Sequence, residues 1–212
     1  MKDLVLIGAG GFGREVAWLV DNINKVEKVW NLVGFIDPAH KGESLNGVPV
    51  LGGMEWLSSR QSPVSVVCTI GNPEIRSKVI AEVSIYSTVS FATLIDPSVI
   101  MSKWVEVGEG SIICAGSILT VNISIGKHVI VNLDCTVGHD ATINDFCTLY
   151  PSVNLSGNTH LKSYVELGTG SQVIQGINVE DRTIVGAGAV VVRNLPANCT
   201  AVGSPAKPIK FN

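Results

Sequence analysis

The tripeptide Gly138-His139-Asp140 places a histidine directly beside a carboxylate. Histidine is the usual general base near neutral pH, and a neighbouring carboxylate can raise the basicity of the imidazole and stabilise the imidazolium. We therefore predict that His139 removes a proton from an attacking group, with Asp140 as its partner. The alternative is a solvated surface pair without a catalytic role, and the surrounding sequence pattern distinguishes the two.

A second candidate site is the motif Gly8-x-Gly10-x-x-Gly13, which follows the apolar run of residues 4–7. A strand, a glycine turn and a helix start together form a phosphate site, because free N–H groups and the helix dipole favour an anion. Asp37 ends the next apolar run, where an acid can bind a ribose hydroxyl. This pattern predicts a mononucleotide site. A NAD-linked oxidoreductase is disfavoured because a dinucleotide needs two such halves; a glycine turn without ligand is the other alternative.

The element that would position His139 is a repeat with a period of six residues. A period of six fits neither a helix nor an alternating strand, and it predicts triangular coils of about eighteen residues that bury one large and one small side chain per side. His139 then lies close to a turn and can project outward. Seventeen consecutive positions at this spacing are aliphatic or Met: Ile95, Met101, Val107, Ile113, Leu119, Ile125, Val131, Val137, Ile143, Leu149, Leu155, Leu161, Leu167, Val173, Val179, Val185 and Val191.

The first part of the chain has a different pattern, in which short apolar runs alternate with helical spacing. This alternation is the mark of a parallel α/β sheet. We expect strands at residues 4–7, 32–36 and 64–70, helices at residues 14–23, 54–59 and 74–83, and a connection over residues 84–94. The sequence therefore predicts a half-Rossmann-like α/β domain over residues 1–84 and a β-helix of hexapeptide repeats over residues 85–212.

Composition and charge argue against several classes of protein. The net charge is −3 without a Lys/Arg run, which argues against nucleic-acid binding. No apolar stretch approaches the length of a membrane span, and the N-terminus has the pattern of a first strand and not of a signal peptide. The five cysteines form no CxxC pair, and the four histidines have no metal-ligand spacing. We therefore expect a cytoplasmic protein with reduced thiols and without a metal.

The chain resembles the PglD/NeuD-type sugar acetyltransferases over essentially its whole length. The repeat and the closing segment at residues 202–207 resemble those of the left-handed β-helix of hexapeptide acyltransferases. The narrower resemblance lies in four stretches: residues 7–13, 34–37, 70–76 and 132–140. It implies an acetyl-CoA-dependent homotrimer with the coenzyme between subunits. Transfer from a thioester needs a base but no covalent enzyme intermediate, so the cysteines need no role.

The resemblance also implies roles for individual residues. His139 and Asp140 correspond to the general base and its partner, and relatives often have histidines where this chain has Phe12 and Thr148. The expected substrate-binding residues are Gly10, Gly11, Asp37, Ile70, Gly71, Asn72 and Asn132. The expected acetyl-CoA residues are Thr148, Gly157, Thr169 and Ala187.

We therefore predict acetyl transfer to the amino group of a UDP-type nucleotide-activated sugar. One alternative within the same class is O-acetylation of sialic acid or of another glycan precursor. An alternative from another class is a non-catalytic solenoid that serves as a scaffold or binding module, which the His139-Asp140 pair disfavours.

Overall fold

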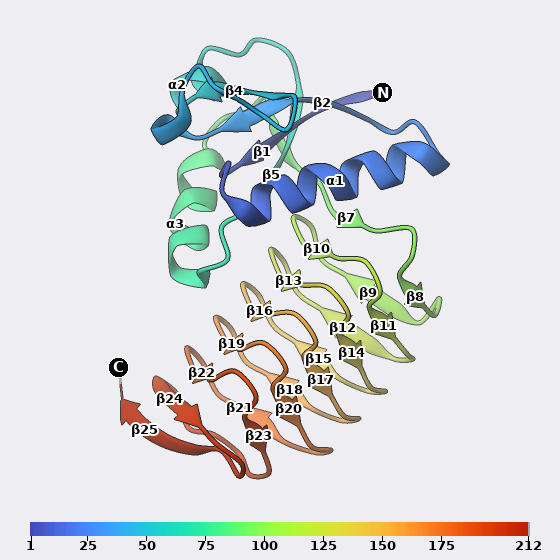
Figure 1. Ribbon diagram of the computed structural model, residues 1–212, viewed down its shortest axis with the longest axis vertical. Helices are drawn as coiled ribbons and strands as arrows, with labels where there is room; N and C mark the ends of the chain where they lie inside the picture. The colour runs from blue at the N-terminus through green and yellow to red at the C-terminus, as the bar shows by residue number, and fades with distance from the viewer. Residues whose placement is uncertain (212) are drawn as a thin grey trace. The chain divides into compact units, whose positions relative to one another are not determined.

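The computed structural model describes residues 1–211, and the chain divides into two compact units. The first unit comprises Met1–Pro97, and the second begins at Ser98. The two are described separately below, and both appear in Figure 1.

The first unit is a six-stranded sheet with the strand order β3-β4-β2-β1-β5-β6. All neighbouring strands are parallel except β3 and β4, which form an antiparallel pair. The strands are β1 (Lys2–Ile7), β2 (Trp30–Ile36), β3 (Ser44–Leu45), β4 (Val48–Gly52), β5 (Val64–Cys68) and β6 (Val89–Phe91), and the short β7 (Leu94–Ile95) ends the unit.

Helices follow the strands of this sheet, as expected for a parallel α/β arrangement. The helix α1 (Gly11–Val26) begins at the glycine turn and buries Val16, Leu19 and Val20, which share one face at helical spacing. The helix α3 (Pro73–Val83) begins with a proline at its first position and with Asn72 as its N-cap. The remaining helices are short: η1 (Pro38–His40) and α2 (Glu55–Ser58).

The expected strands and helices are present, although the strand expected over residues 64–70 ends at Cys68. The structure adds β3 and β4, which were not predicted, and a further strand in the segment expected to be a connection. Residues 84–94 contain β6, which pairs with β5 in the register Val64↔Val89 and Val66↔Phe91. A three-residue strand is too short to show a period of two, so only its partner β5 reveals it.

The second unit is a left-handed parallel β-helix in which each full coil contributes one short strand to each of three faces (Figure 1). The first face contains β10 (Ile112–Ile113), β13 (Ile130–Val131), β16 (Thr148–Leu149), β19 (Glu166–Leu167), β22 (Ile184–Val185), β24 (Cys199–Val202) and β25 (Lys207–Phe211). The second face contains β8 (Ile100–Met101), β11 (Ile118–Leu119), β14 (Thr136–Val137), β17 (Asn154–Leu155), β20 (Gln172–Val173) and β23 (Val190–Val191). The third face contains β9 (Val105–Val107), β12 (Ile123–Ile125), β15 (Thr142–Ile143), β18 (His160–Leu161) and β21 (Asn178–Val179).

The period of six is confirmed by burial. From Ile113 to Val191, every aliphatic residue of the repeat is buried at the end of its strand. Buried hydroxyls among the small inward residues bond to backbone carbonyls: Ser111 Oγ donates to Gly126 O at 2.9 Å, and Ser117 Oγ donates to Asn132 O at 3.0 Å. These bonds satisfy polar groups that would otherwise destabilise the core.

Turns connect the faces along three edges, and equivalent residues stack every eighteen positions. We call the turns from first-face to second-face strands the first edge, those from second-face to third-face strands the second edge, and the rest the third edge. The third edge carries a column in which His128, Phe146 and Tyr164 stack with ring centroids 5.2 Å apart and Arg182 lies 4.6 Å from the Tyr164 ring. His128 is thus buried in this column.

All five cysteines are free and buried. Burial raises the pKa of the Cys68 and Cys135 thiols to about 11. Among residues 1–211 no helix is both long and apolar enough to cross a membrane, and no group of three or more His, Cys, Asp or Glu side chains gathers as a metal site would require.

Candidate active site

His139 and Asp140 lie in the second-edge turn that follows β14. Asp140 has a φ of 58°, a left-handed conformation that Asp tolerates better than most residues do. The His139 Nδ1 atom lies 2.8 Å from Asp140 Oδ2. About half of each side chain is exposed, 53% for His139 and 52% for Asp140, so the pair projects from the edge as predicted.

The electrostatics of the pair define the proton positions. The hydrogen bond with His139, supported by a second one from Asn122, holds the pKa of Asp140 below its usual value. An ionised carboxylate can only accept, so Nδ1 of His139 is the donor in this contact. In the neutral ring the Nε2 atom then carries the lone pair, and no group within residues 1–211 donates a hydrogen bond to it. The imidazole can therefore accept a proton at Nε2.

Gly157 lies one coil beyond His139, at the equivalent position of the next second-edge turn. A Cβ built on Gly157 would lie 2.5 Å from Cε1 and 2.9 Å from Cδ2 of the His139 ring, and it would also overlap Nε2. The imidazole thus occupies the space that any other residue at position 157 would fill. The glycine predicted for the coenzyme site thus leaves room for the predicted base.

The glycine turn of the first unit brings β1 and α1 close together. Gly8 has a φ of +106°, and a Cβ on Gly13 would overlap the Gly8 carbonyl oxygen, so both positions require glycine for the turn itself. Within the described chain, a Cβ on Gly10 or Gly11 would meet no atom within 4 Å. These two glycines therefore leave open space at the helix N-terminus, where free N–H groups favour an anion.

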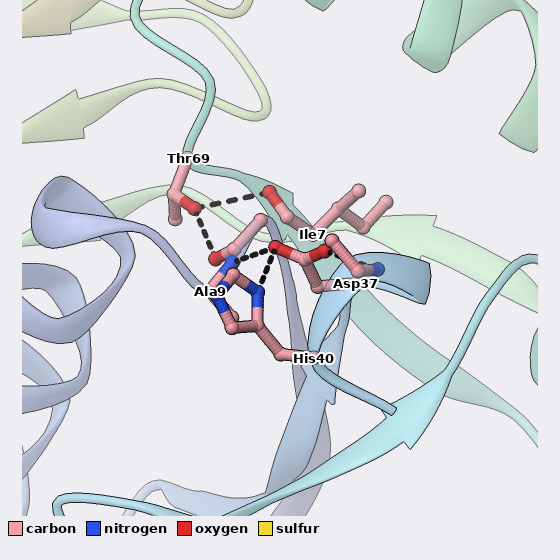
Figure 2. A network of polar contacts seen from close by, with 7 residues as sticks. Ile7, Ala9, Asp37, His40 and Thr69 are labelled. Carbon is pink, nitrogen blue, oxygen red and sulfur yellow. Dashed lines mark hydrogen bonds and ion pairs between the residues drawn. The ribbon is translucent and has the colours of Figure 1, made fainter. Parts of the chain in front are cut away.

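Asp37 connects this turn to the end of β2 (Figure 2). Its Oδ2 accepts from the Ala9 N–H at 3.0 Å, its Oδ1 accepts from the Ala39 N–H at 3.0 Å, and His40 Nδ1 lies 3.4 Å from Oδ2. Burial acts to raise the pKa of Asp37, but these interactions outweigh it and the net pKa is lowered. An ionised acid is thus fixed beside the glycine turn.

Thr69, at the end of β5, completes this polar network from the third strand. Its Oγ1 lies 3.0 Å from Ile7 O and 2.8 Å from Gly8 O and donates to these carbonyls (Figure 2). The carboxyl ends of β1, β2 and β5 are therefore bonded to one another. In parallel α/β sheets this is the edge at which ligands bind.

A cavity of about 610 Å³ opens at this edge. It brings together four of the predicted substrate residues, namely Gly10, Gly11, Asp37 and Ile70. Phe12 also contributes to its wall. Gly8 of the predicted glycine motif lines the cavity as well. The remaining lining residues were not predicted as site residues: Ile7, Ile36, Pro38, Met54, Thr69, Val79 and Glu82.

Two predicted substrate residues, Gly71 and Asn72, follow Ile70 but do not line the cavity. The Asn72 side chain caps α3 by accepting from the Ile75 N–H at 3.0 Å. Arg76, which is only 1% exposed, donates through Nη1 to the carbonyls of Ile70 and Gly71 at 2.7 Å each. This stretch therefore has a clear local role in shaping the turn beside the cavity.

The predicted coenzyme residues fall on different parts of the β-helix. Thr169 and Ala187 are exposed on the first edge, whereas Gly157 lies on the second edge and Thr148 is buried on β16 of the first face. Asn132 is also on the first edge, so the structure separates it from His139 within one chain.

The first edge offers a bare backbone near Thr169 and Ala187. Each is flanked by glycines, and within the described chain a Cβ on Gly170 or Gly188 would meet nothing within 4 Å. A long, narrow ligand such as the pantetheine arm of coenzyme A can approach the backbone closely at such a surface. The residues present therefore fit the predicted coenzyme.

Comparisons with known proteins agree with this geometry. A family model described as the PglD N-terminal domain matches residues 3–83. The acetyltransferase domain of PglB from Neisseria gonorrhoeae is 32% identical, with a TM-score of 0.92, covering 99% of this chain and 100% of that chain. This chain belongs to the PglD-type family of hexapeptide-repeat sugar acetyltransferases. As a member of this family, it is an acyltransferase that uses acetyl-CoA.

Two further relatives indicate the substrates found in the family. The GDP-perosamine N-acetyltransferase of Escherichia coli is 28% identical over 213 residues, which cover 97% of this chain and 95% of that protein. A histidine-to-asparagine variant of perosamine N-acetyltransferase from Caulobacter crescentus, in complex with CoA and GDP-perosamine, is 29% identical with a TM-score of 0.89, covering 99% of this chain and 98% of that chain. The PglB domain has also been solved in complex with acetyl coenzyme A.

Proposed function

We propose that this acetyltransferase transfers the acetyl group of acetyl-CoA to the amino group of a nucleotide-activated amino sugar. The observation that carries the proposal is the His139-Asp140 pair, in which Nδ1 is held by a carboxylate and Nε2 carries the lone pair. A base oriented in this way can take the proton that an amine must lose when it becomes an amide.

The chemical step balances without a covalent enzyme intermediate. The amine nitrogen attacks the thioester carbonyl and forms the C–N bond, while Nε2 of His139 accepts the amine proton. The C–S bond then breaks, and the imidazolium can return the proton to the departing thiolate of CoA. Asp140 stabilises the positive charge on the ring between these events. The buried Cys68 and Cys135 are poor nucleophiles, because a pKa of about 11 keeps them protonated near neutral pH.

We assign the nucleotide-sugar to the cavity of the first unit, within residues 1–84. The N-terminus of α1 favours the diphosphate, with Gly10 and Gly11 leaving room for it, and Asp37 is placed for a hydroxyl or a base N–H. The sequence predicts a UDP-type substrate, whereas two of the named relatives act on or bind GDP-perosamine. The substrate panel described below therefore includes both UDP- and GDP-linked amino sugars.

We further propose that acetyl-CoA binds between subunits of a homotrimer, on the β-helix of residues 85–212. The support is the separation of the predicted residues: Thr169 and Ala187 lie on the first edge, and His139 and Gly157 lie on the second. Two edges of one chain cannot meet, but the first edge of one subunit can meet the second edge of its neighbour in a closed ring. In such a ring Asn132 would approach the neighbour's second edge, and Thr148 would lie on the adjoining face.

The principal alternative is O-acetylation of sialic acid or another glycan precursor, since His139 could equally deprotonate a hydroxyl. Phe12 bears on this choice because it places an uncharged aromatic ring in the cavity wall where relatives often have histidine. A silent scaffold is disfavoured, because the Asp140 contact orients the His139 ring in the way catalysis requires.

The proposal is tested by release of CoA thiol from acetyl-CoA with UDP-, GDP- and dTDP-amino sugars and with free sialic acid. We expect turnover with a nucleotide-amino sugar and none with sialic acid. His139→Ala should lower kcat by roughly 10² to 10⁴ with little change in the KM for acetyl-CoA, the usual contribution of a positioned base. Asp140→Asn should cost less. A folded His139→Ala protein with near-normal turnover would refute the assignment of the base.

A further inference from the structure

The eighteen-residue coil places Asn122 directly one coil before Asp140 on the second edge. The strands that precede the two turns are in register, with Leu119 of β11 opposite Val137 of β14. The turns themselves are bonded, because the Asp140 N–H donates to Val121 O at 3.0 Å. The side chains of residues 122 and 140 therefore project from stacked turns.

The Asn122 amide contacts the catalytic carboxylate. Its Nδ2 donates to Asp140 Oδ1 at 3.1 Å, while Asp140 Oδ2 makes the contact with His139. Each carboxylate oxygen thus has its own partner, one from the coil below and one from its own turn. Two bonds to different oxygens fix the plane of the carboxylate, which one bond alone would leave free to rotate.

This second bond matters because the pair is half-exposed. Ion pairs between exposed side chains are weak, since solvent screens them and the side chains lose rotamer freedom to form them. Asn122 is well suited to hold Asp140: its φ of 56° is a left-handed conformation that Asn adopts readily, and its short side chain has few rotamers to lose.

We infer that Asn122 is a positioning residue for the acetyl-transfer base: it holds Asp140 in the orientation that presents His139 Nε2 to the acceptor. The inference rests on the proposed function of His139. Asn122 itself touches no reacting atom and acts through Asp140.

The charges around the pair are few. On the second edge, the neighbouring coil below contributes Val121 and Asn122, and the coil above contributes Gly157 and Asn158, all uncharged. One coil further down, Lys103 and Glu106 line a pocket together with Asn122, so both charges lie near the Asn122 side of the pair. Among residues 1–211 the Coulombic contribution to the lowered pKa of Asp140 comes from His139, and the hydrogen bonds of His139 and Asn122 lower it as well. A change at position 122 should consequently be visible in the pH dependence of the reaction.

The test uses two variants of the enzyme that should shift the acid limb of the pH–rate profile in opposite directions. Asn122→Gly removes the amide without straining the backbone, because glycine accepts a φ of 56°. It should lower kcat about 10-fold, below the 10² to 10⁴ expected for loss of the base itself. The KM for acetyl-CoA should not change, and the acid limb of the pH–rate profile should move to lower pH because Asp140 supports the imidazolium less well.

Asn122→Asp keeps the size and the backbone preference but places a second carboxylate beside the pair. The added negative charge favours the imidazolium, so the acid limb should move to higher pH, opposite to Asn122→Gly. The matched control is Asn198→Gly, which removes an exposed asparagine with the same φ of 56° from another turn of the β-helix. It should leave both kcat and the profile unchanged.

Two outcomes would overturn the inference. One is an Asn122→Gly enzyme with wild-type kcat and profile; the other is a loss of kcat in both variants without opposite shifts of the acid limb. His139→Ala is measured in parallel, because it separates failure of this inference from failure of the proposed function. An inactive His139→Ala with a normal Asn122→Gly refutes only the role of Asn122, whereas an active His139→Ala refutes the base and the inference together.

Discussion

Gly157 contacts the His139 ring, so the effect of adding a single methyl group at position 157 on kcat can be estimated from the structure. Gly157→Ala adds one methyl group, whose carbon would lie 2.5 Å from Cε1 of the imidazole. Non-bonded carbons are at their best about 3.5 to 4.0 Å apart. The ring must therefore retreat by about 1 Å, and it can do so because 53% of the side chain is exposed.

A displacement of this size is enough to disable a base without unfolding the protein. Misplacement of a catalytic group by about 1 Å can cost about 10²-fold in rate. We therefore expect Gly157→Ala to lower kcat about 100-fold, while its thermal unfolding temperature stays close to that of the wild type. Steady-state release of CoA thiol gives kcat and both KM values, and differential scanning calorimetry gives the stability.

Gly138→Ala is the informative comparison because it adds the same methyl group on the same edge. There a Cβ would lie 2.6 Å from Gly157 N and 2.8 Å from the Ser156 carbonyl carbon, which are backbone atoms that cannot swing away. This variant should lose stability as well as rate. If Gly157→Ala instead kept its kcat and raised only the KM for acetyl-CoA, Gly157 would serve the coenzyme alone and our reasoning about the ring would be refuted.

Three further predictions concern the rest of the molecule. Gly11→Glu should weaken nucleotide-sugar binding but not acetyl-CoA binding in calorimetric titrations, because the open space admits the side chain and its charge repels phosphate; equal loss of both ligands would indicate misfolding. Asp37→Asn should lower the urea midpoint at pH 7, and the difference from wild type should shrink as the pH falls below about 3.9, since a lowered folded-state pKa stabilises only above the unfolded value; a difference independent of pH would contradict this. Equilibrium sedimentation should show a trimer at micromolar concentration, and a monomer alone would rule out the shared coenzyme site.

The period of the repeat made the β-helix predictable from sequence. Each hexapeptide needs a turn and one buried aliphatic residue, and both requirements are local. The pattern is therefore visible in every hexapeptide independently of the others. The position of His139 near a turn followed directly. In the first unit, the order of apolar runs and helical spacing sufficed for the main strands and helices, whereas β6 was missed because its three residues are defined only by pairing with β5.

The parts of the candidate site that escaped prediction depend on contacts between distant segments. Val79 and Glu82 line the cavity because α3 packs beside the end of β5, and no local pattern marks them as ligand-facing. The contact between Asn122 and Asp140 could, by contrast, have been found from the sequence, because the two residues are eighteen positions apart. Once a coil length is known, that spacing is a usable signal for side chains that touch across coils.

The strict register of the coils also limits how this protein can change length. Each coil contacts only its neighbours, so a solenoid can gain or lose whole repeats without rebuilding its core. A single-residue insertion between Asn122 and Asp140 would rotate the later turns out of register and break their contact. An eighteen-residue duplication inserted there would preserve the core but place a new turn between them, whereas the same duplication after Tyr164 would leave them together. The coils that carry His139, Thr169 and Ala187 should therefore keep a fixed count, because a repeat gained among them would shift the proposed coenzyme residues relative to the base.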